Sequence, residues 1–164
     1  MIIVVMGVSG VGKSLIGQKL AASLGWTFVD ADSFHSPQAI AQMRAGIPLT
    51  DRDRQPWLVA LHQAVLEWQA TGDNVVLACS ALKQRYREMI QGQVPVEWVY
   101  LRADPDLIRT RLQQRQGHFM GAKLLASQLA TLEEPQDAVV VEAENSVAAI
   151  VTAITQHLKL EPSS

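Results

Sequence analysis

An eight-residue glycine-rich segment near the N-terminus constrains this chain more than any other feature. Residues 7–14 read Gly-Val-Ser-Gly-Val-Gly-Lys-Ser, which is the spacing G-x-x-x-x-G-K-S. The apolar run Ile2–Met6 precedes it and predicts a buried strand. The residues that follow predict a helix with Ile16, Leu20 and Leu24 on one face. A strand, a glycine-rich loop and a helix in this order are typical of a phosphate-binding loop.

Each part of this segment has a physical role in holding phosphate. Lys13 supplies a positive charge for the outer phosphates, and the Ser14 hydroxyl is a candidate ligand of Mg²⁺. The N-terminus of the following helix adds its positive dipole end. A glycine-rich turn without a ligand is the alternative, but the flanking strand and helix favour a nucleotide site. The backbone N–H groups expected to face phosphate oxygens belong to Gly7, Val8, Ser9, Gly10, Val11, Gly12, Lys13 and Ser14.

Length, charge and cysteine content narrow the class of protein. The chain has 164 residues, which suits one domain with a sizeable core. Its formal net charge of −2 gives no reason to expect a nucleic-acid partner. Cys79 is the single cysteine, so no disulfide forms within the chain, and a cytoplasmic location is expected. The N-terminal apolar run is too short for a signal peptide or a membrane span.

Strand-like and helix-like segments alternate along the whole chain. This alternation predicts a three-layer α/β fold with a five-stranded parallel sheet and helices on both faces, joined by right-handed crossovers. We expect further strands at residues 27–29, 75–78, 96–101 and 139–141. We expect further helices at about residues 37–44, 50–70, 104–116, 124–132 and 146–158, and one that carries Lys83, Tyr86 and Arg87, with a disordered tail at 161–164.

Several features separate the possible classes of nucleotide-binding protein. No Asn-Lys-x-Asp guanine-binding motif is present, which argues against a switch GTPase. The third predicted strand ends in Cys79-Ser80, whereas two carboxylates, Asp30 and Asp32, end the second strand. An arginine-bearing helix leads into a glycine-bounded stretch, residues 111–121, that would close over ATP and exclude water. These features favour a small-molecule kinase over a motor ATPase.

Further motifs resemble those of the gluconate kinase family, and the resemblance runs from Ile2 to the last strand. The segments Cys79-Ser80-Ala81-Leu82-Lys83 and Gly117-His118-Phe119 are the most selective. The others are the phosphate loop with Met6, Asp30-Ala31-Asp32 with His35, Gly46-Ile47-Pro48-Leu49-Thr50-Asp51, Asp53-Arg54 with Pro56-Trp57, Tyr86-Arg87, and Arg115. Ala31 and Val11 depart from the glycine and serine found in some members, and both changes should be tolerated.

The resemblance implies a fold, a reaction and an organisation. Members share the fold of shikimate and nucleoside monophosphate kinases, with five parallel strands. They transfer the γ-phosphate of ATP to the 6-hydroxyl of D-gluconate with Mg²⁺, and are often homodimers. We therefore expect one kinase domain over residues 1–160, with a substrate-binding helical region at about 33–70 and a lid at about 116–132. No membrane partner is implied.

The resemblance also implies roles for single residues. Asp32 is the candidate base that orients the attacking hydroxyl, and Asp30 is the candidate partner of Mg²⁺ through water. The alternative for both aspartates is that they only cap the end of the strand. Arg115 is the candidate that offsets charge on the transferring phosphate, and Arg111 faces the adenine or inner phosphates. The remaining candidates for binding gluconate are His35, Arg54, Lys83, Arg87 and His118, with a solvated helix face as the alternative for the basic residues. Lys83 and Arg87 lie at i and i+4, so we expect them to share one helix face beside a strand end. Trp57, Trp68 and Trp98 are expected to pack in or near the core, and Cys79 to be a buried, inert thiol.

Two alternatives to a gluconate kinase stay open at this point. One is a kinase of the same fold that acts on shikimate or a nucleotide, for which no base-reading group is identified. The other is a nucleotide-binding module without catalysis. The acidic pair and the basic residues beside the predicted lid argue against that module, because a switch needs no second substrate site.

Overall fold

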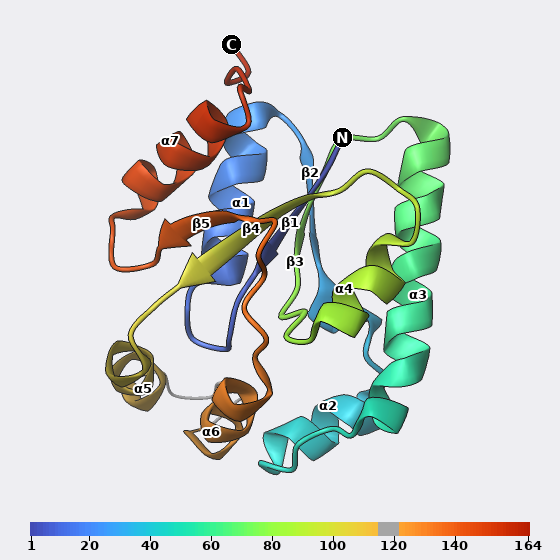
Figure 1. Ribbon diagram of the computed structural model, residues 1–164, viewed down its shortest axis with the longest axis vertical. Coiled ribbons are helices and arrows are strands. Elements are labelled where there is room, and N and C mark those ends of the chain that lie inside the picture. Colours follow the sequence, from blue (N-terminus) through green and yellow to red (C-terminus); the bar gives the residue numbers. More distant parts are fainter. Residues whose placement is uncertain (115–121) are drawn as a thin grey trace.

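The computed structural model describes residues 1–114 and 122–164, and these build one parallel sheet with helices on both faces (Figure 1). The order across the sheet is β2-β3-β1-β4-β5, and every pair of neighbours is parallel. The α/β architecture predicted from the alternating segments is therefore confirmed. The strands are β1 (Ile2–Met6), β2 (Thr27–Asp30), β3 (Val75–Ala78), β4 (Glu97–Arg102) and β5 (Val139–Glu142).

The helices form two layers and a cap beyond the strand ends (Figure 1). Helices α1 and α7 cover one face of the sheet, and α3 and α4 cover the other, while α2, α5 and α6 lie beyond the carboxyl ends of the strands. Within the described ranges no helix is long and apolar enough to cross a bilayer. The helices are α1 (Lys13–Leu24), α2 (Pro37–Arg44), α3 (Asp51–Thr71), α4 (Gln84–Gln91), α5 (Pro105–Gln114), α6 (Ala122–Thr131) and α7 (Val147–His157), with a short 3-10 helix, η1 (Ala31–Phe34).

Strand β1 shows why the core has two halves. All five of its residues are buried, because it lies in the middle of the sheet. Ile2, Val4 and Met6 pack with residues of α3 and α4, whereas Ile3 and Val5 pack with α1 and α7. Successive side chains of a strand point to opposite faces, so a continuous apolar run is what two covered faces require.

Local sequence explains how the helices near the site begin. Ser36 caps α2 by accepting from Ala39 N at 3.1 Å, as predicted. Thr50 and Asp53 form a reciprocal capping box at the start of α3, each accepting from the other's backbone N–H. At the chain's other end, Ser163 N donates to Ser23 O at 2.8 Å, so the tail predicted to be disordered lies against α1.

Candidate active site

The predicted phosphate loop connects β1 to α1 with the backbone that such a loop needs. Gly7 has φ of +150°, and a Cβ there would lie 2.9 Å from Leu101 O, so a larger residue would displace the loop. Gly12 has φ of +101° and precedes α1, whose first turn receives no side-chain cap. The uncapped N–H groups of that turn leave donors and a positive dipole end for an anion. The Lys13 ammonium donates to Val8 O at 3.1 Å within the loop.

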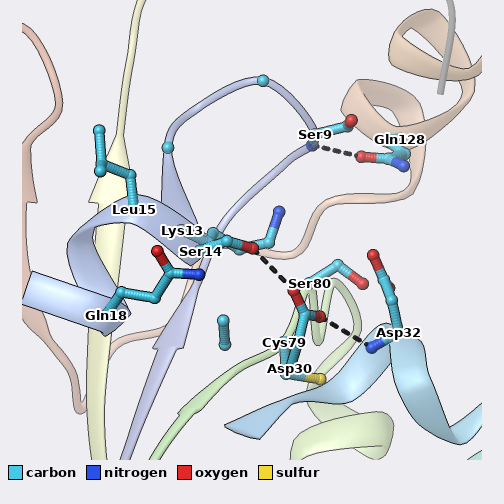
Figure 2. Close-up of a pocket in the computed structure, with 13 residues that line it drawn as sticks. Ser9, Lys13, Ser14, Leu15, Gln18, Asp30, Asp32, Cys79, Ser80 and Gln128 are labelled. Atoms are coloured by element: carbon cyan, nitrogen blue, oxygen red, sulfur yellow. Dashed lines mark hydrogen bonds between the residues drawn. The ribbon is translucent and has the colours of Figure 1, made fainter. Parts of the chain in front are cut away.

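A cavity of about 260 Å³ opens beside this loop, and we call it the loop cavity. Figure 2 shows Lys13 and Ser14 on one side of it, with Asp30, Asp32 and Ser80 opposite. The carboxyl ends of β2 and β3 supply the second group, which is where ligands bind in open parallel sheets. The full lining is Ser9, Gly10, Gly12, Lys13, Ser14, Leu15, Gln18, Asp30, Asp32, Ala78, Cys79, Ser80 and Gln128.

Ser14 and Asp30, the two residues predicted to hold Mg²⁺, contact each other beside the phosphate loop. Ser14 Oγ donates to Asp30 Oδ2 at 2.8 Å, and Asp30 Oδ1 accepts from Asp32 N at 2.9 Å. Among the described residues, no cluster of three or more His, Cys, Asp and Glu side chains is gathered for a metal. Mg²⁺ commonly keeps several waters and takes only one or two protein oxygens beside substrate phosphates. A hydroxyl and a carboxylate in contact at the phosphate loop therefore fit that ion.

A second, smaller cavity of about 30 Å³ adjoins the first and lies against α3 and the residues before it. We call it the helical cavity. It shares Asp32, Ser80 and Gln128 with the loop cavity, so the two cavities meet at these three residues, which we call the junction. The full lining is Asp32, His35, Met43, Pro48, Leu49, Arg54, Trp57, Ser80, Leu82, Ser127 and Gln128.

His35 lies in the helical cavity as a neutral, oriented ring. It stacks on Trp57 with ring centroids 4.5 Å apart and an interplanar angle of 9°. Trp57 is buried, as predicted, and its Nε1 donates to Ala31 O at 2.8 Å, which fixes the stack. Burial, and to a lesser extent the nearby Arg54 charge, lowers the pKa of His35 to about 4. At neutral pH the imidazole is therefore uncharged and offers one donor and one acceptor.

Arg54 is the one member of the predicted basic trio, Arg54, Lys83 and Arg87, that lines the helical cavity. Its Nη1 donates to Tyr86 Oη at 3.2 Å, and Tyr86 Oη in turn donates to Asp51. Lys83 is instead held beside the cavity, with its Nζ 3.1 Å from Asp51 Oδ1. The hydrogen bond from Tyr86, followed by that from Lys83, lowers the pKa of the Asp51 carboxyl. This carboxylate thus ties the start of α3 to the start of α4.

The structure corrects the predicted role of Arg87. Its Nη1 donates to Ala81 O at 2.6 Å and its Nη2 to Glu133 O at 2.8 Å, and its side chain is buried and lines neither cavity. The prediction assumed that Lys83 and Arg87 share one helix face. Lys83, however, precedes α4 as its N-cap, so the i to i+4 relation within a helix does not apply. Arg87 instead braces Ala81, whose φ of 44° lies in the left-handed region.

Of the remaining predicted residues, Arg111 lines a third cavity, whereas Arg115 and His118 are not described by the structure. Arg111 lines a cavity of about 300 Å³ on the α7 side of the phosphate loop, which we call the outer cavity. Its Nη2 lies 3.4 Å from Ala143 O, and the cavity walls include Leu15, Val147 and Ile150. Arg115, His118 and residues 116–121 of the predicted lid lie outside the described residues.

Two residues of the junction, Ser80 and Gln128, were not among the predicted site residues. Ser80 follows β3 as Asp32 follows β2, so the rule that ligands bind at strand ends would have identified it. Gln128 belongs to α6, and no local motif distinguishes it from other helical glutamines. Cys79, the buried thiol next to Ser80, agrees with the prediction of an inert cysteine, because burial raises its pKa to about 12.

Comparisons with known proteins show the family and the fold of this chain. A family model described as an AAA domain matches residues 2–135. A gluconokinase of Gluconobacter oxydans is 48% identical over 136 residues, covering 82% of this chain and 76% of that protein. The crystal structure of a gluconokinase from Sinorhizobium meliloti has a TM-score of 0.84 and 40% identity, covering 96% of this chain and 90% of that one. A shikimate kinase from Bacteroides thetaiotaomicron, at 18% identity and a TM-score of 0.72 over 98% of this chain and 99% of its own, shares the fold.

Proposed function

This chain is an AAA-domain protein of the gluconokinase family, and we propose that it transfers the γ-phosphate of ATP to the 6-hydroxyl of D-gluconate, giving 6-phospho-D-gluconate. The loop cavity, the helical cavity and the outer cavity supply the three sites that this reaction needs. They hold the phosphates, the acceptor and the base of the nucleotide, respectively.

The donor half of the reaction uses the phosphate loop. Its N–H groups and Lys13 would hold the phosphates of ATP, while Arg111 and the apolar walls of the outer cavity would hold the adenine. Ser14, and Asp30 through water, would hold Mg²⁺, which when bound neutralises phosphate charge. Gly12 and Leu15 line both cavities, so one nucleotide would span them.

The acceptor half uses the helical cavity. Arg54 is a guanidinium that would bind the gluconate carboxylate with charge-assisted hydrogen bonds. The neutral His35 ring would donate to or accept from sugar hydroxyls, and Trp57 keeps that ring in place. The helical cavity alone is too small for a six-carbon acid, so the acceptor would extend through the junction toward the phosphate loop.

Asp32 lies at the junction, and this is the observation that carries the proposal. Its position brings one carboxylate to both the phosphate cavity and the acceptor cavity. There it would orient the 6-hydroxyl and accept its proton late in transfer, as that oxygen forms its bond to phosphorus and the bond to ADP breaks. Phosphoryl transfer asks the protein chiefly for positioning and charge stabilisation, which this arrangement provides.

A coupled assay of ADP release over a panel of acceptors tests the proposal. The panel holds D-gluconate, other sugar acids, shikimate and nucleoside monophosphates. We expect ADP release that depends on gluconate, with 6-phosphogluconate as the product. Faster turnover with shikimate or a nucleotide would assign the chain to another kinase activity. If no acceptor in the panel stimulates ADP release, a nucleotide-binding module without catalysis would be favoured.

The family resemblance supports a proposal for the quaternary structure, and the single cysteine supports one for the location. We propose a cytoplasmic homodimer in which each subunit is one kinase domain over residues 1–160. Light scattering on the purified chain measures its mass, and a monomeric mass at micromolar concentration would contradict the dimer.

A further inference from the structure

Gln128, on the capping helix α6, makes a long-range contact with the phosphate loop. Its Oε1 accepts from Ser9 N at 2.7 Å, and both residues are buried. Figure 2 shows the carboxamide lying against the loop at Ser9, on the same side as Asp32 and Ser80. The loop therefore has a backbone donor whose acceptor comes from a helix far along the chain.

Gln128 lies at the junction, where the loop cavity and the helical cavity meet. Asp32 and Ser80 reach the junction from the ends of β2 and β3, whereas Gln128 reaches it from α6. It is thus the junction residue that connects the capping helix to the phosphate loop. The preceding residue, Ser127, lines the helical cavity as well.

Other contacts hold α6 in the orientation that this hydrogen bond needs. Leu125 is fully buried against Val8 of the phosphate loop, together with Leu82 and Ile108. Just after α6, Glu133 N donates to Leu82 O at 2.8 Å, and Glu133 Oε1 accepts from Gln84 N at 2.9 Å. The helix is therefore fixed to the loop on one side and to the start of α4 on the other.

We propose that Gln128 is a positioning residue for phosphoryl transfer, because its carboxamide fixes the phosphate loop at Ser9 and excludes water from the junction. A buried N–H needs an acceptor, so the loop loses a defined position when that acceptor is removed. A kinase must also keep water from its transferred group. If water enters, its oxygen forms the bond to phosphorus in place of the 6-hydroxyl, and the products are ADP and inorganic phosphate. This inference rests on the proposed kinase activity.

Gln128→Met tests the inference, because methionine has a similar length but lacks the amide acceptor. We expect kcat for gluconate phosphorylation to fall about 10–100-fold, the cost of misplacing a reacting group, with KM for ATP within about twofold of the parent. The ratio of ADP released to 6-phosphogluconate formed should rise above the parent's. Gln63→Met, at an exposed position on α3, is the matched control and should leave all three quantities unchanged.

Gln128→Glu sharpens the test, because it keeps an accepting oxygen at the same distance but adds a charge beside the phosphates. We expect it to raise KM for ATP while the ratio of ADP to phosphorylated product stays at the parent's value. Gln128→Met should therefore change kcat and the product ratio, whereas Gln128→Glu should change KM for ATP. A purely structural role predicts instead that both variants lower Tm and leave the ratio unchanged.

The inference fails if Gln128→Met keeps the parent's kcat and product ratio, or if it lowers Tm alone. Hydrogen exchange of the nucleotide-free chain provides a readout that does not need gluconate: the Ser9 amide should exchange faster in Gln128→Met than in the parent and in Gln63→Met. If the parent does not phosphorylate gluconate, the proposed function falls, but the exchange rate still decides whether Gln128 fixes the loop. Equal exchange in all three proteins would overturn the inference.

Discussion

The phosphate loop and the helical cavity lie on either side of one junction, but the chain builds them in different ways. The loop is one contiguous segment, residues 7–14, between a buried strand and an uncapped helix. The helical cavity draws residues from η1, from α2, from the segment before α3, from α3, from the segment after β3 and from α6. A contiguous motif carries its geometry in its own sequence, whereas an assembled cavity depends on the contacts that hold its parts together.

This difference predicts where substitutions act. A substitution of a phosphate-binding side chain in the loop should lower phosphoryl transfer and leave the fold intact, because that side chain would contact the phosphates of ATP. A change around the helical cavity should alter acceptor affinity or stability, according to whether the side chain faces the cavity or braces its wall.

The largest effect is expected for Lys13→Ala. The substitution removes the charge that holds the outer phosphates, so kcat/KM should fall about 10³-fold, the upper range for losing one charge-stabilising donor. Thermal unfolding should give nearly the parent's Tm, because Lys13 is the first residue of α1 and its ammonium is only partly buried. A variant that turns over ATP and gluconate like the parent would show that the loop is misassigned.

Arg54→Ala should act on the acceptor alone. Losing a charge-assisted hydrogen bond of about 1.5–3 kcal/mol should raise KM for gluconate about 10–100-fold, while KM for ATP stays near the parent's value. Arg52→Ala, at an exposed position two residues earlier, is the control. Equal effects of the two variants on KM for gluconate would place the carboxylate elsewhere.

Arg87→Met separates bracing from binding. It leaves Ala81 O and Glu133 O without their Arg87 donor, so Tm should fall by about 4–12 °C, given about 2–3 kcal/mol and about 2–4 °C per kcal/mol. Arg85→Met, which removes an exposed ion pair with Asp51 and a cation–π contact 5.7 Å from the Tyr86 ring centroid, should change Tm much less. If Arg87→Met raises KM for gluconate without lowering Tm, the original assignment of Arg87 to the substrate is right.

The smallest expected effect is the pH dependence contributed by His35. Its pKa is about 4 in the folded chain, below the ordinary value of 6.5, so between these values the unfolded chain binds more protons. His35 therefore stabilises the fold above about pH 6.5, and this contribution is lost as the pH falls toward 4. His35→Gln should show a smaller drop in Tm from pH 7 to pH 5 than the parent, with the exposed His157→Gln as control. Identical drops in all three proteins would contradict the neutral, buried ring.

The same contrast explains what the sequence could predict. The phosphate loop is a contiguous motif, and the strands and helices follow from hydrophobic periodicity along the chain. Both signals lie in neighbouring residues, so the loop and the order of the elements were predicted closely. Asp30 and Asp32 were predictable because parallel strand ends meet at one edge of a sheet. Lys83 and Arg87 were assigned from helical spacing, which failed because α4 begins one residue after Lys83 and because Arg87 points to backbone carbonyls. Gln128 could not be found, because only folding brings α6 to Ser9.

The central claim is that the two halves of the site meet at Asp32, which acts on the acceptor, while Asp30 serves the metal. Steady-state kinetics of Asp32→Asn and Asp30→Asn over a range of Mg²⁺ concentrations test this claim most directly. We predict that Asp32→Asn lowers kcat about 10²–10⁴-fold with little change in KM for ATP, and that Asp30→Asn raises the Mg²⁺ requirement. A nearly normal kcat for Asp32→Asn, with its loss confined to Mg²⁺ affinity, would contradict the claim and reverse the two aspartates.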